Sequence, residues 1–268
     1  MLNILFNPKK AERHPITMMF VGIFYSSLSI FLSAWIFPDY ASLVMVFFTV
    51  LSCLYVVQGA IRVEENKEYD YKSEKWLLRQ HSRLVFLILF LFLGFVFSFA
   101  FWTVVLPVEK VSVLFGLQNS VVEGIKFLSS TGGVINNGAF FAILLNNLKV
   151  LFISLIFAFL YGAGAIFVLV WNASVMGFVI GELAREGLGI ISLPVAFTKY
   201  FIHGIPEMLG YLIVAVAGGI LYVAVFRGDF LKPGRKKRII IDTSILILIS
   251  VVLLVIAALV EVYVSPYI

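Results

Sequence analysis

Long apolar runs separated by short polar segments dominate the hydrophobic pattern of this chain. Each run holds about 20 residues with few charges, the length that a helix needs to cross a hydrocarbon core of about 30 Å. The backbone groups of an open strand would stay unpaired in lipid, so the runs predict helices. The predicted helices lie near Ile16–Phe37, Ala41–Ile61, Leu84–Leu106, Ala142–Trp171, Pro206–Phe226 and Ile239–Val264.

The composition supports the same class of protein. The chain is 62% hydrophobic and 13% charged, whereas a soluble domain carries roughly 25% charged residues. We therefore expect an all-α, polytopic transmembrane helix bundle. It forms a single membrane domain over residues 1–268, with three N-terminal spans in 1–107, an outward-facing connection in 108–141, a core in 142–226 and a last span in 239–264. The single cysteine, Cys53, excludes a disulfide within the chain.

The basic residues predict an orientation in the cell membrane. Fifteen of the 20 Lys and Arg residues lie before the first helix, in the second connection and before the last helix. They are Lys9, Lys10 and Arg13, then Arg62, Lys67, Lys72, Lys75, Arg79 and Arg83, then Arg227, Lys232, Arg235, Lys236, Lys237 and Arg238. Short cytoplasmic loops carry an excess of Lys and Arg, so these segments and the N-terminus are predicted to be cytoplasmic.

This orientation requires the segment 172–205 to cross back toward the outer side of the membrane. The predicted helices before and after it both run inward, so part of the segment has to return to the outer side. Ala173–Glu182 is too short for an ordinary span at roughly 1.5 Å per residue, and Gly187, Gly189 and Pro194 interrupt the remainder of the segment. We expect about six full spans and a short or re-entrant helical segment here, and irregular backbone at that depth packs only against protein or a water-filled cavity.

The connection 108–138 contains a predicted amphipathic helix. Its apolar residues recur at helical spacing, and its polar residues lie off that stripe. The apolar residues are Leu114, Leu117, Val121, Val122, Ile125 and Leu128, and the polar ones are Gln118, Glu123 and Lys126. Two interpretations remain open: a helix that lies on the outer leaflet and a helix that caps the bundle.

A set of polar residues in the second half of the chain forms the candidate site, because an ionisable residue at membrane depth is a functional-site hypothesis. The set is Asn146, Asn147, Asn172, Glu182, Arg185, His203, Gly204 and Glu207. His203 and Glu207 are four residues apart and share a helix face. They could hydrogen-bond or supply two metal ligands, whereas zinc sites use three or four protein ligands. Glu182 is a possible third ligand that no spacing places there.

The same residues also have a structural interpretation. If Pro206 is the first residue of a helix, His203 and Glu207 fasten the start of that helix near the outer interface. The Asn side chains would then hydrogen-bond between helices. Small residues four apart predict close helix packing, within the chain or between two copies. These are Ala173, Gly177 and Gly181, followed by Ala215 and Gly219.

The order of these polar and glycine positions resembles a known family. The positions are Asn146-Asn147, Gly162, Gly164, Asn172, Gly177, His203-Gly204-x-x-Glu207 and Ala217-Gly218-Gly219. They resemble the SpoIIM (stage II sporulation protein M) family of integral membrane proteins, over about Asn146–Phe226. Ala173 departs from the glycine that the family often has there, which puts only local packing in question. The resemblance implies that Asn146, Asn147, Asn172, His203 and Glu207 carry the family's polar signature.

The best-known members of that family tether a peptidoglycan-degrading assembly at the septal membrane, as anchors and not as the hydrolase. The resemblance therefore implies a non-enzymatic scaffold. A transporter or channel with a polar site in 172–205 is the first alternative. An intramembrane hydrolase that uses His203 and Glu207, or Glu182, is the second. We expect no cofactor and no nucleic acid; the expected partners are the lipid bilayer, other membrane-associated proteins and a second copy of the chain.

Overall fold

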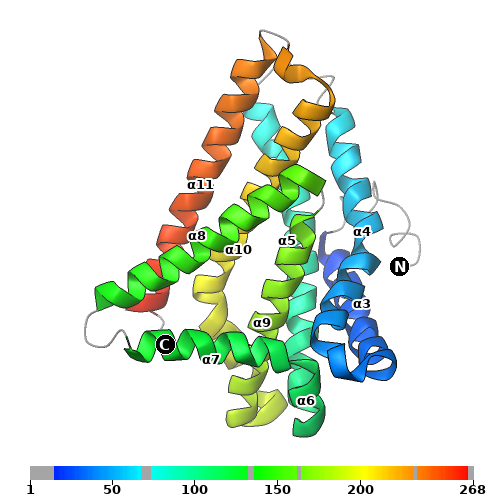
Figure 1. The fold of residues 1–268 in the computed structure, drawn as a ribbon, viewed down its shortest axis with the longest axis vertical. Coiled ribbons are helices and arrows are strands. Elements are labelled where there is room, and N and C mark those ends of the chain that lie inside the picture. Colours follow the sequence, from blue (N-terminus) through cyan, green and yellow to red (C-terminus); the bar gives the residue numbers. More distant parts are fainter. Residues whose placement is uncertain (1–14, 68–73, 132–135, 162–163, 232–233, 265–268) are drawn as a thin grey trace. The chain divides into compact units, whose positions relative to one another are not determined.

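The computed structural model of this 268-residue chain describes residues 15–67, 74–131, 136–161, 164–231 and 234–264. Every regular element in these ranges is a helix (Figure 1), which confirms the predicted all-α class. The elements are α3 (Pro15–Ile36), η1 (Pro38–Tyr40), α4 (Ala41–Lys67), α5 (Glu74–Val105), α6 (Val108–Leu114), α7 (Gly116–Thr131), α8 (Asn136–Tyr161), α9 (Ala165–Glu186), η3 (Gly189–Ser192), α10 (Leu193–Phe226), η4 (Asp229–Leu231) and α11 (Arg235–Tyr263).

Within these ranges, seven helical stretches are long and apolar enough to cross a membrane. They are Ile16–Ile36, Pro38–Gly59, Val85–Val105, Phe140–Leu160, Ala165–Glu186, Gly204–Phe226 and Arg235–Tyr263. The prediction of one helix over 142–171 is wrong, because the chain there forms α8 and α9. Glycine is a poor helix former, and Gly162 and Gly164 lie between the two helices. Gly162 itself lies outside the described residues.

The segment 172–205 is therefore far more regular than the sequence predicted. Asn172 lies inside α9, whose 22 residues span about 33 Å. Only residues 187–192 separate α9 from α10, and Gly189 in this turn has a φ of 63°, a conformation that glycine adopts without steric cost. α10 continues to Phe226 with Pro206 inside it, so Pro206 does not begin a helix.

The chain divides into two compact units, and each is described by itself. Unit 1 comprises Met1–Gly132 and Leu169–Tyr200. Unit 2 comprises Gly133–Val168 and Phe201–Ile268. Most of α9 thus belongs to unit 1, and the membrane-spanning part of α10 belongs to unit 2.

Close glycine contacts hold the helices of unit 1 together. α3 packs against α5 and α4, and a Cβ added to Gly94 of α5 would lie 2.2 Å from the carbonyl oxygen of Met19 on α3. α9 also packs against the C-terminal half of α5, since a Cβ on Gly177 would lie 2.5 Å from the Cβ of Phe99. Gly181 approaches Thr103 in the same way. Such contacts let helix backbones approach closely, as small residues do in membrane bundles.

α7 runs sideways from α6 in Figure 1 and packs against α4. The burial of its polar and apolar side chains is contrary to expectation. Gln118 is fully buried, whereas Leu117 is 46% and Val121 38% exposed. The sequence stripe ran through Leu114, but that residue belongs to α6, and α7 starts afresh at Gly116. The side chains of Ile125, Lys126 and Leu128 lie outside the described part.

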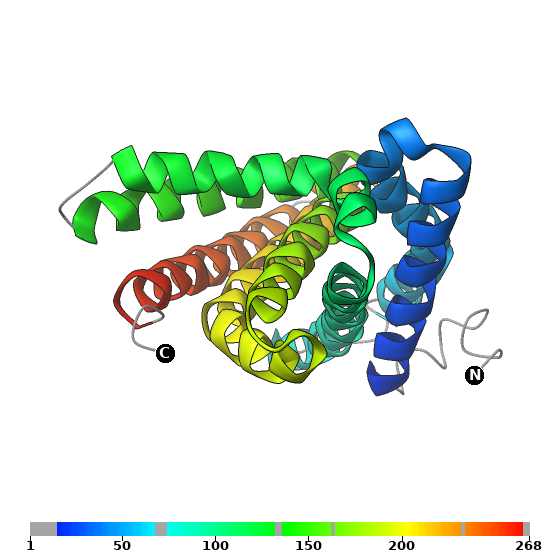
Figure 2. The same ribbon diagram turned by 90° about the horizontal axis from the view of Figure 1, so that it is seen from below.

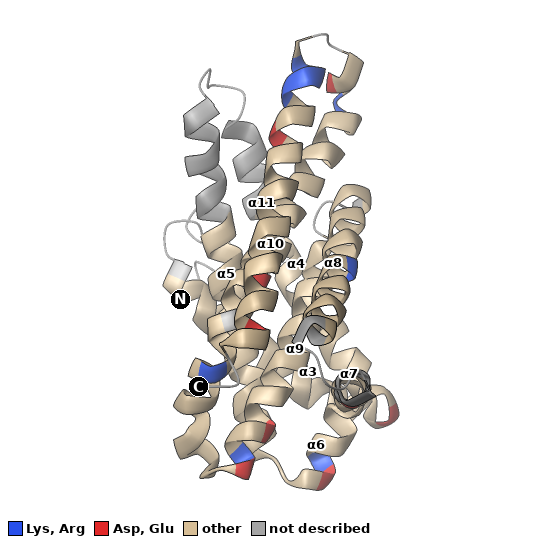
Figure 3. Ribbon diagram, turned by 90° about the vertical axis from the view of Figure 1, so that its left-hand side faces the viewer, with Lys and Arg blue, Asp and Glu red and all other residues tan. Residues whose placement is uncertain are grey.

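Unit 2 is built from α8, α10 and α11. α8 packs against α11, and Gly218 of α10 meets α8, because a Cβ there would lie 2.6 Å from the Cβ of Ala158. α10 and α11 run side by side (Figure 2), with Gly210 of α10 next to Ser250 and Leu254 of α11. Figure 3 shows Lys and Arg at the start of α11 and acidic residues further along these two helices.

Candidate functional site

Arg185 in α9 binds the end of α5 in unit 1. Its Nη2 donates a hydrogen bond to the carbonyl oxygen of Leu106 and lies 3.5 Å from that of Val104. These carbonyl groups belong to the last turn of α5 and the residue that follows it. The last carbonyl groups of a helix have no N–H partner within the helix, and the helix dipole favours a cation at this end. Arg185 therefore fastens α9 to α5.

Asn172 and Glu182 are the other polar candidate residues on α9. Glu182 Oε1 is 3.9 Å from Arg185 Nη1 and has no hydrogen-bond partner among the described residues. Asn172 is half-buried, and Ala173 beside it is fully buried. Asn172, Glu182 and Arg185 all belong to unit 1, so the structure assigns Glu182 to a different unit from Glu207.

Gln118 forms a polar junction that the sequence did not point to. Its Nε2 donates to Ser174 Oγ of α9 at 3.0 Å and to the Ser42 carbonyl oxygen of α4 at 3.4 Å. Ser42 Oγ in turn donates to the Val113 carbonyl oxygen of α6 at 3.0 Å. Nothing in the sequence distinguishes a neutral amide on the polar side of a helix from a solvent-exposed one, yet here Gln118 joins α7, α4 and α9.

In unit 2, Asn147 lies on the buried face of α8 and Asn146 is exposed. Asn147 shares its face with Leu151, Ser154 and Ala158, which are also buried and recur at helical spacing. Asn147 is 4% exposed, and neither its Nδ2 nor Ser154 Oγ has a hydrogen-bond partner among the described residues. Buried polar atoms are normally paired, so these two positions mark the least satisfied part of α8.

Glu207 of α10 is held by a neighbour one turn further along its helix. Tyr211 is fully buried, and its hydroxyl donates to Glu207 Oε1 at 2.8 Å. Glu261 of α11 interacts electrostatically with Glu207. Two carboxylates that lie near each other inside a helix bundle repel, and a proton or a cation bound between them reduces that repulsion. The i, i+4 spacing of Glu207 and Tyr211 was readable in the sequence, whereas Glu261 looked like the end of a span.

The remaining candidate residues of α10 are His203, Gly204 and the predicted packing pair Ala215 and Gly219. The backbone of His203 lies in α10, but its side chain lies outside the described part of the structure, and so does its predicted pairing with Glu207. Gly204 is buried. Ala215 is half-buried, and a Cβ on Gly219 would meet nothing within 4 Å. The close approach predicted for Gly219 occurs at Gly218, one position earlier.

No group of three His, Cys, Asp or Glu side chains that could hold a metal ion occurs among the described residues. The candidate residues thus form two groups. In unit 1, Arg185 and Gln118 hold neighbouring helices together, and in unit 2 two carboxyl groups lie near a phenol. We define the latter, Glu207, Tyr211 and Glu261, as the acidic cluster.

Comparisons with known proteins cover most of these features. A family model described as SpoIIM, stage II sporulation protein M, matches residues 84–266. The chain is also 38% identical over 132 residues to the uncharacterized protein MJ0793 of Methanocaldococcus jannaschii, which covers 47% of this chain and 70% of that protein. No solved structure matches. The matched region extends beyond 146–226 and includes most of α5 and all of α11, and with them Val104, Leu106 and the whole acidic cluster.

Proposed function

This chain belongs to the SpoIIM family and is a membrane protein with several spans, and from that premise we propose that it acts as a non-enzymatic scaffold for a membrane-associated protein assembly. The observation that supports this best is the use of polar side chains in unit 1. Arg185 holds the end of α5, and Gln118 joins three helices. These polar groups fix helices in place, which is what a rigid anchor requires.

The scaffold proposal is tested by crosslinking in native membranes, affinity purification and mass spectrometry. Wild type is compared with Glu207→Gln, which keeps the size of a side chain in the family's polar signature, and with Glu186→Gln, a change at an exposed position. We expect a specific partner protein with wild type and Glu186→Gln, and a marked loss with Glu207→Gln at unchanged folding. If wild type enriches no protein above a mock purification, the scaffold proposal is rejected.

The proposed orientation places the N-terminus in the cytoplasm. With α8 and α9 as separate spans, the segments before α3, between α4 and α5, and between α10 and α11 all fall on one side. These segments carry fifteen of the 20 Lys and Arg residues, and the positive-inside rule assigns them to the cytoplasm. The residues Lys9, Lys10, Arg13, Lys72 and Lys232 lie outside the described ranges, so this argument rests on their sequence positions.

One observation favours a second function, transport. The broken segment that the sequence suggested for it is replaced by the continuous helices α9 and α10. The acidic cluster supplies a different reason, because carboxyl groups inside spans mark ion and proton pathways. Purified protein in liposomes would show a flux of protons or alkali cations that Glu207→Gln and Glu261→Gln both abolish. The absence of flux with wild type would remove this alternative. The hydrolase alternative gains no supporting observation.

A further inference from the structure

The start of α11 carries a dense basic surface next to a membrane span. Arg235, Lys236, Lys237 and Arg238 are all exposed, and the apolar stretch of α11 comes directly after them. Arg235 is engaged, since its Nη1 lies 2.7 Å from Asp229 Oδ1. Lys236 and Lys237 form no ion pair with any residue in the described ranges. Both side chains are thus exposed, and no carboxylate in the described ranges pairs with them.

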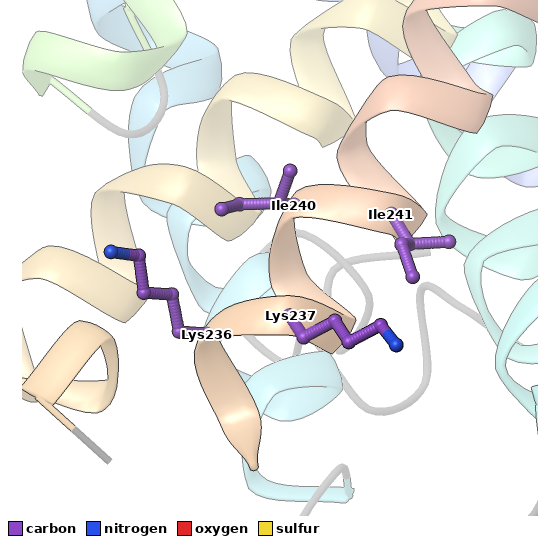
Figure 4. Close-up of a pocket in the computed structure, with 4 residues that line it drawn as sticks. All are labelled: Lys236, Lys237, Ile240 and Ile241. Atoms are coloured by element: carbon purple, nitrogen blue, oxygen red, sulfur yellow. The ribbon is translucent and has the colours of Figure 1, made fainter. Parts of the chain in front are cut away.

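These two lysines line an open hollow together with two isoleucines. Lys236, Lys237, Ile240 and Ile241 border this hollow of about 400 Å³ on one side only, so it is open to its surroundings. Figure 4 shows the two lysines extending to opposite sides of the helix, with Ile240 and Ile241 one turn further along. Each lysine thus shares a helix face with an isoleucine four residues later. Along the helix axis, each lysine therefore comes first, and its isoleucine follows about 6 Å further into the span.

That order matches the order of groups in a phospholipid. We propose that the start of α11 binds anionic phospholipid, with the phosphate at the ammonium group of Lys236 or of Lys237 and the glycerol and acyl region along the isoleucine on the same helix face, Ile240 or Ile241. The first turn of a helix adds a positive partial charge in the same place. A soluble anion would use the lysines alone, whereas the apolar lining continues into the exposed Ile245 and Leu248 of the span. Clusters of basic residues beside a span attract anionic headgroups.

The test uses the full chain purified in detergent with phosphatidylglycerol or phosphatidylcholine added at equal mole fraction. Native mass spectrometry then measures how much of each lipid the protein retains. The variant is Lys236→Gln/Lys237→Gln. The control is Lys110→Gln/Lys149→Gln, which removes two exposed charges elsewhere. A basic residue near a membrane surface contributes roughly a five-fold factor in affinity. We therefore expect phosphatidylglycerol retention about thirty-fold weaker in the variant and unchanged in the control.

A charge-conserving variant keeps the test decisive. Lys236→Arg/Lys237→Arg should retain phosphatidylglycerol like wild type, and roughly 1 M salt should reduce the preference by screening. Equal retention of both lipids by wild type, an equal loss in variant and control, or displacement of the lipid by inorganic phosphate at the same concentration would each overturn the proposal. No partner protein takes part, so the outcome is independent of the scaffold proposal.

Discussion

At the scale of single residues, Arg185 is the polar side chain with the clearest structural task. It supplies charged donors to carbonyl oxygens at the end of α5, and a hydrogen bond to a charged group contributes roughly 1.5–3 kcal/mol. We predict that Arg185→Leu lowers the unfolding midpoint in detergent by on the order of 5 °C. Glu186→Gln, one position on and exposed, should leave it unchanged. Thermal unfolding followed by size-exclusion chromatography measures both, and equal midpoints for Arg185→Leu and wild type would contradict the fastening role.

Tyr211 is the residue whose removal should affect the acidic cluster most selectively. Tyr211→Phe keeps the buried ring and deletes the hydroxyl that donates to Glu207. The loss of such a hydrogen bond, with its acceptor left in place, costs roughly 1–3 kcal/mol. Tyr222→Phe, at a half-buried position on the same helix, is the matched control and should change stability little. A urea or thermal unfolding series that finds the two variants equally stable would count against the Tyr211–Glu207 interaction.

The sequence predicted part of this site because the free-energy cost of burying an ionisable side chain in a membrane depends on that residue alone. Glu207 stands out since a carboxyl group within an apolar run is expensive. Tyr211 does not, because a phenol is common in membrane helices and its partner depends on rotamer and register. Gln118 was expected on the polar face, and only the joint between α6 and α7 turns it inward. Contacts between distant helices, such as that of Arg185 with Leu106, arise from packing that no local pattern encodes.

At the scale of elements, the main difference from expectation is one interrupted apolar run. The hydropathy of residues 142–171 has no charged interruption apart from Lys149, so it predicted one long helix. Gly162 and Gly164 lie in the sequence between the two helices, and each glycine costs about 1 kcal/mol in a helix interior. Once α8 and α9 are separate, the return to the outer side needs no re-entrant segment. The position of a helix break therefore decided the number of spans.

Two glycines provide a prediction at this scale, because the sequence treated them alike and the structure does not. A Cβ on Gly177 would lie 2.5 Å from Phe99 Cβ, whereas a Cβ on Gly219 meets nothing within 4 Å. Gly177→Ala should push α9 from α5 and cost about 1–3 kcal/mol. Gly219→Ala should be neutral or stabilise by up to about 1 kcal/mol through helix propensity. Unfolding midpoints in detergent measure both changes, and a stabilised Gly177→Ala would contradict the close packing.

At the scale of the whole molecule, the proposed topology follows from seven spans and the positions of the basic residues. It places the three basic segments on one side of the membrane and the α5–α8 and α9–α10 connections on the other. Each unit contributes spans whose polar residues have different tasks: fastening in unit 1 and an acidic cluster in unit 2. In the proposed scaffold, unit 1 supplies the fastened helices and unit 2 the ionisable groups of the acidic cluster.

This arrangement can be tested by cysteine labelling of cells. Cys53 is fully buried and is replaced by Ala, and single cysteines are then introduced as Ser112→Cys, Leu188→Cys and Lys237→Cys, all at exposed positions. Seven spans with a cytoplasmic N-terminus place residues 112 and 188 outside and residue 237 inside. We expect a membrane-impermeant maleimide to label positions 112 and 188 in intact cells, and position 237 only after permeabilisation. Labelling of 112 without 188 would show that α8 or α9 does not cross, because a single failed crossing reverses every connection after it. Labelling of 237 alone would invert the orientation and place the basic surface of α11 on the outer leaflet.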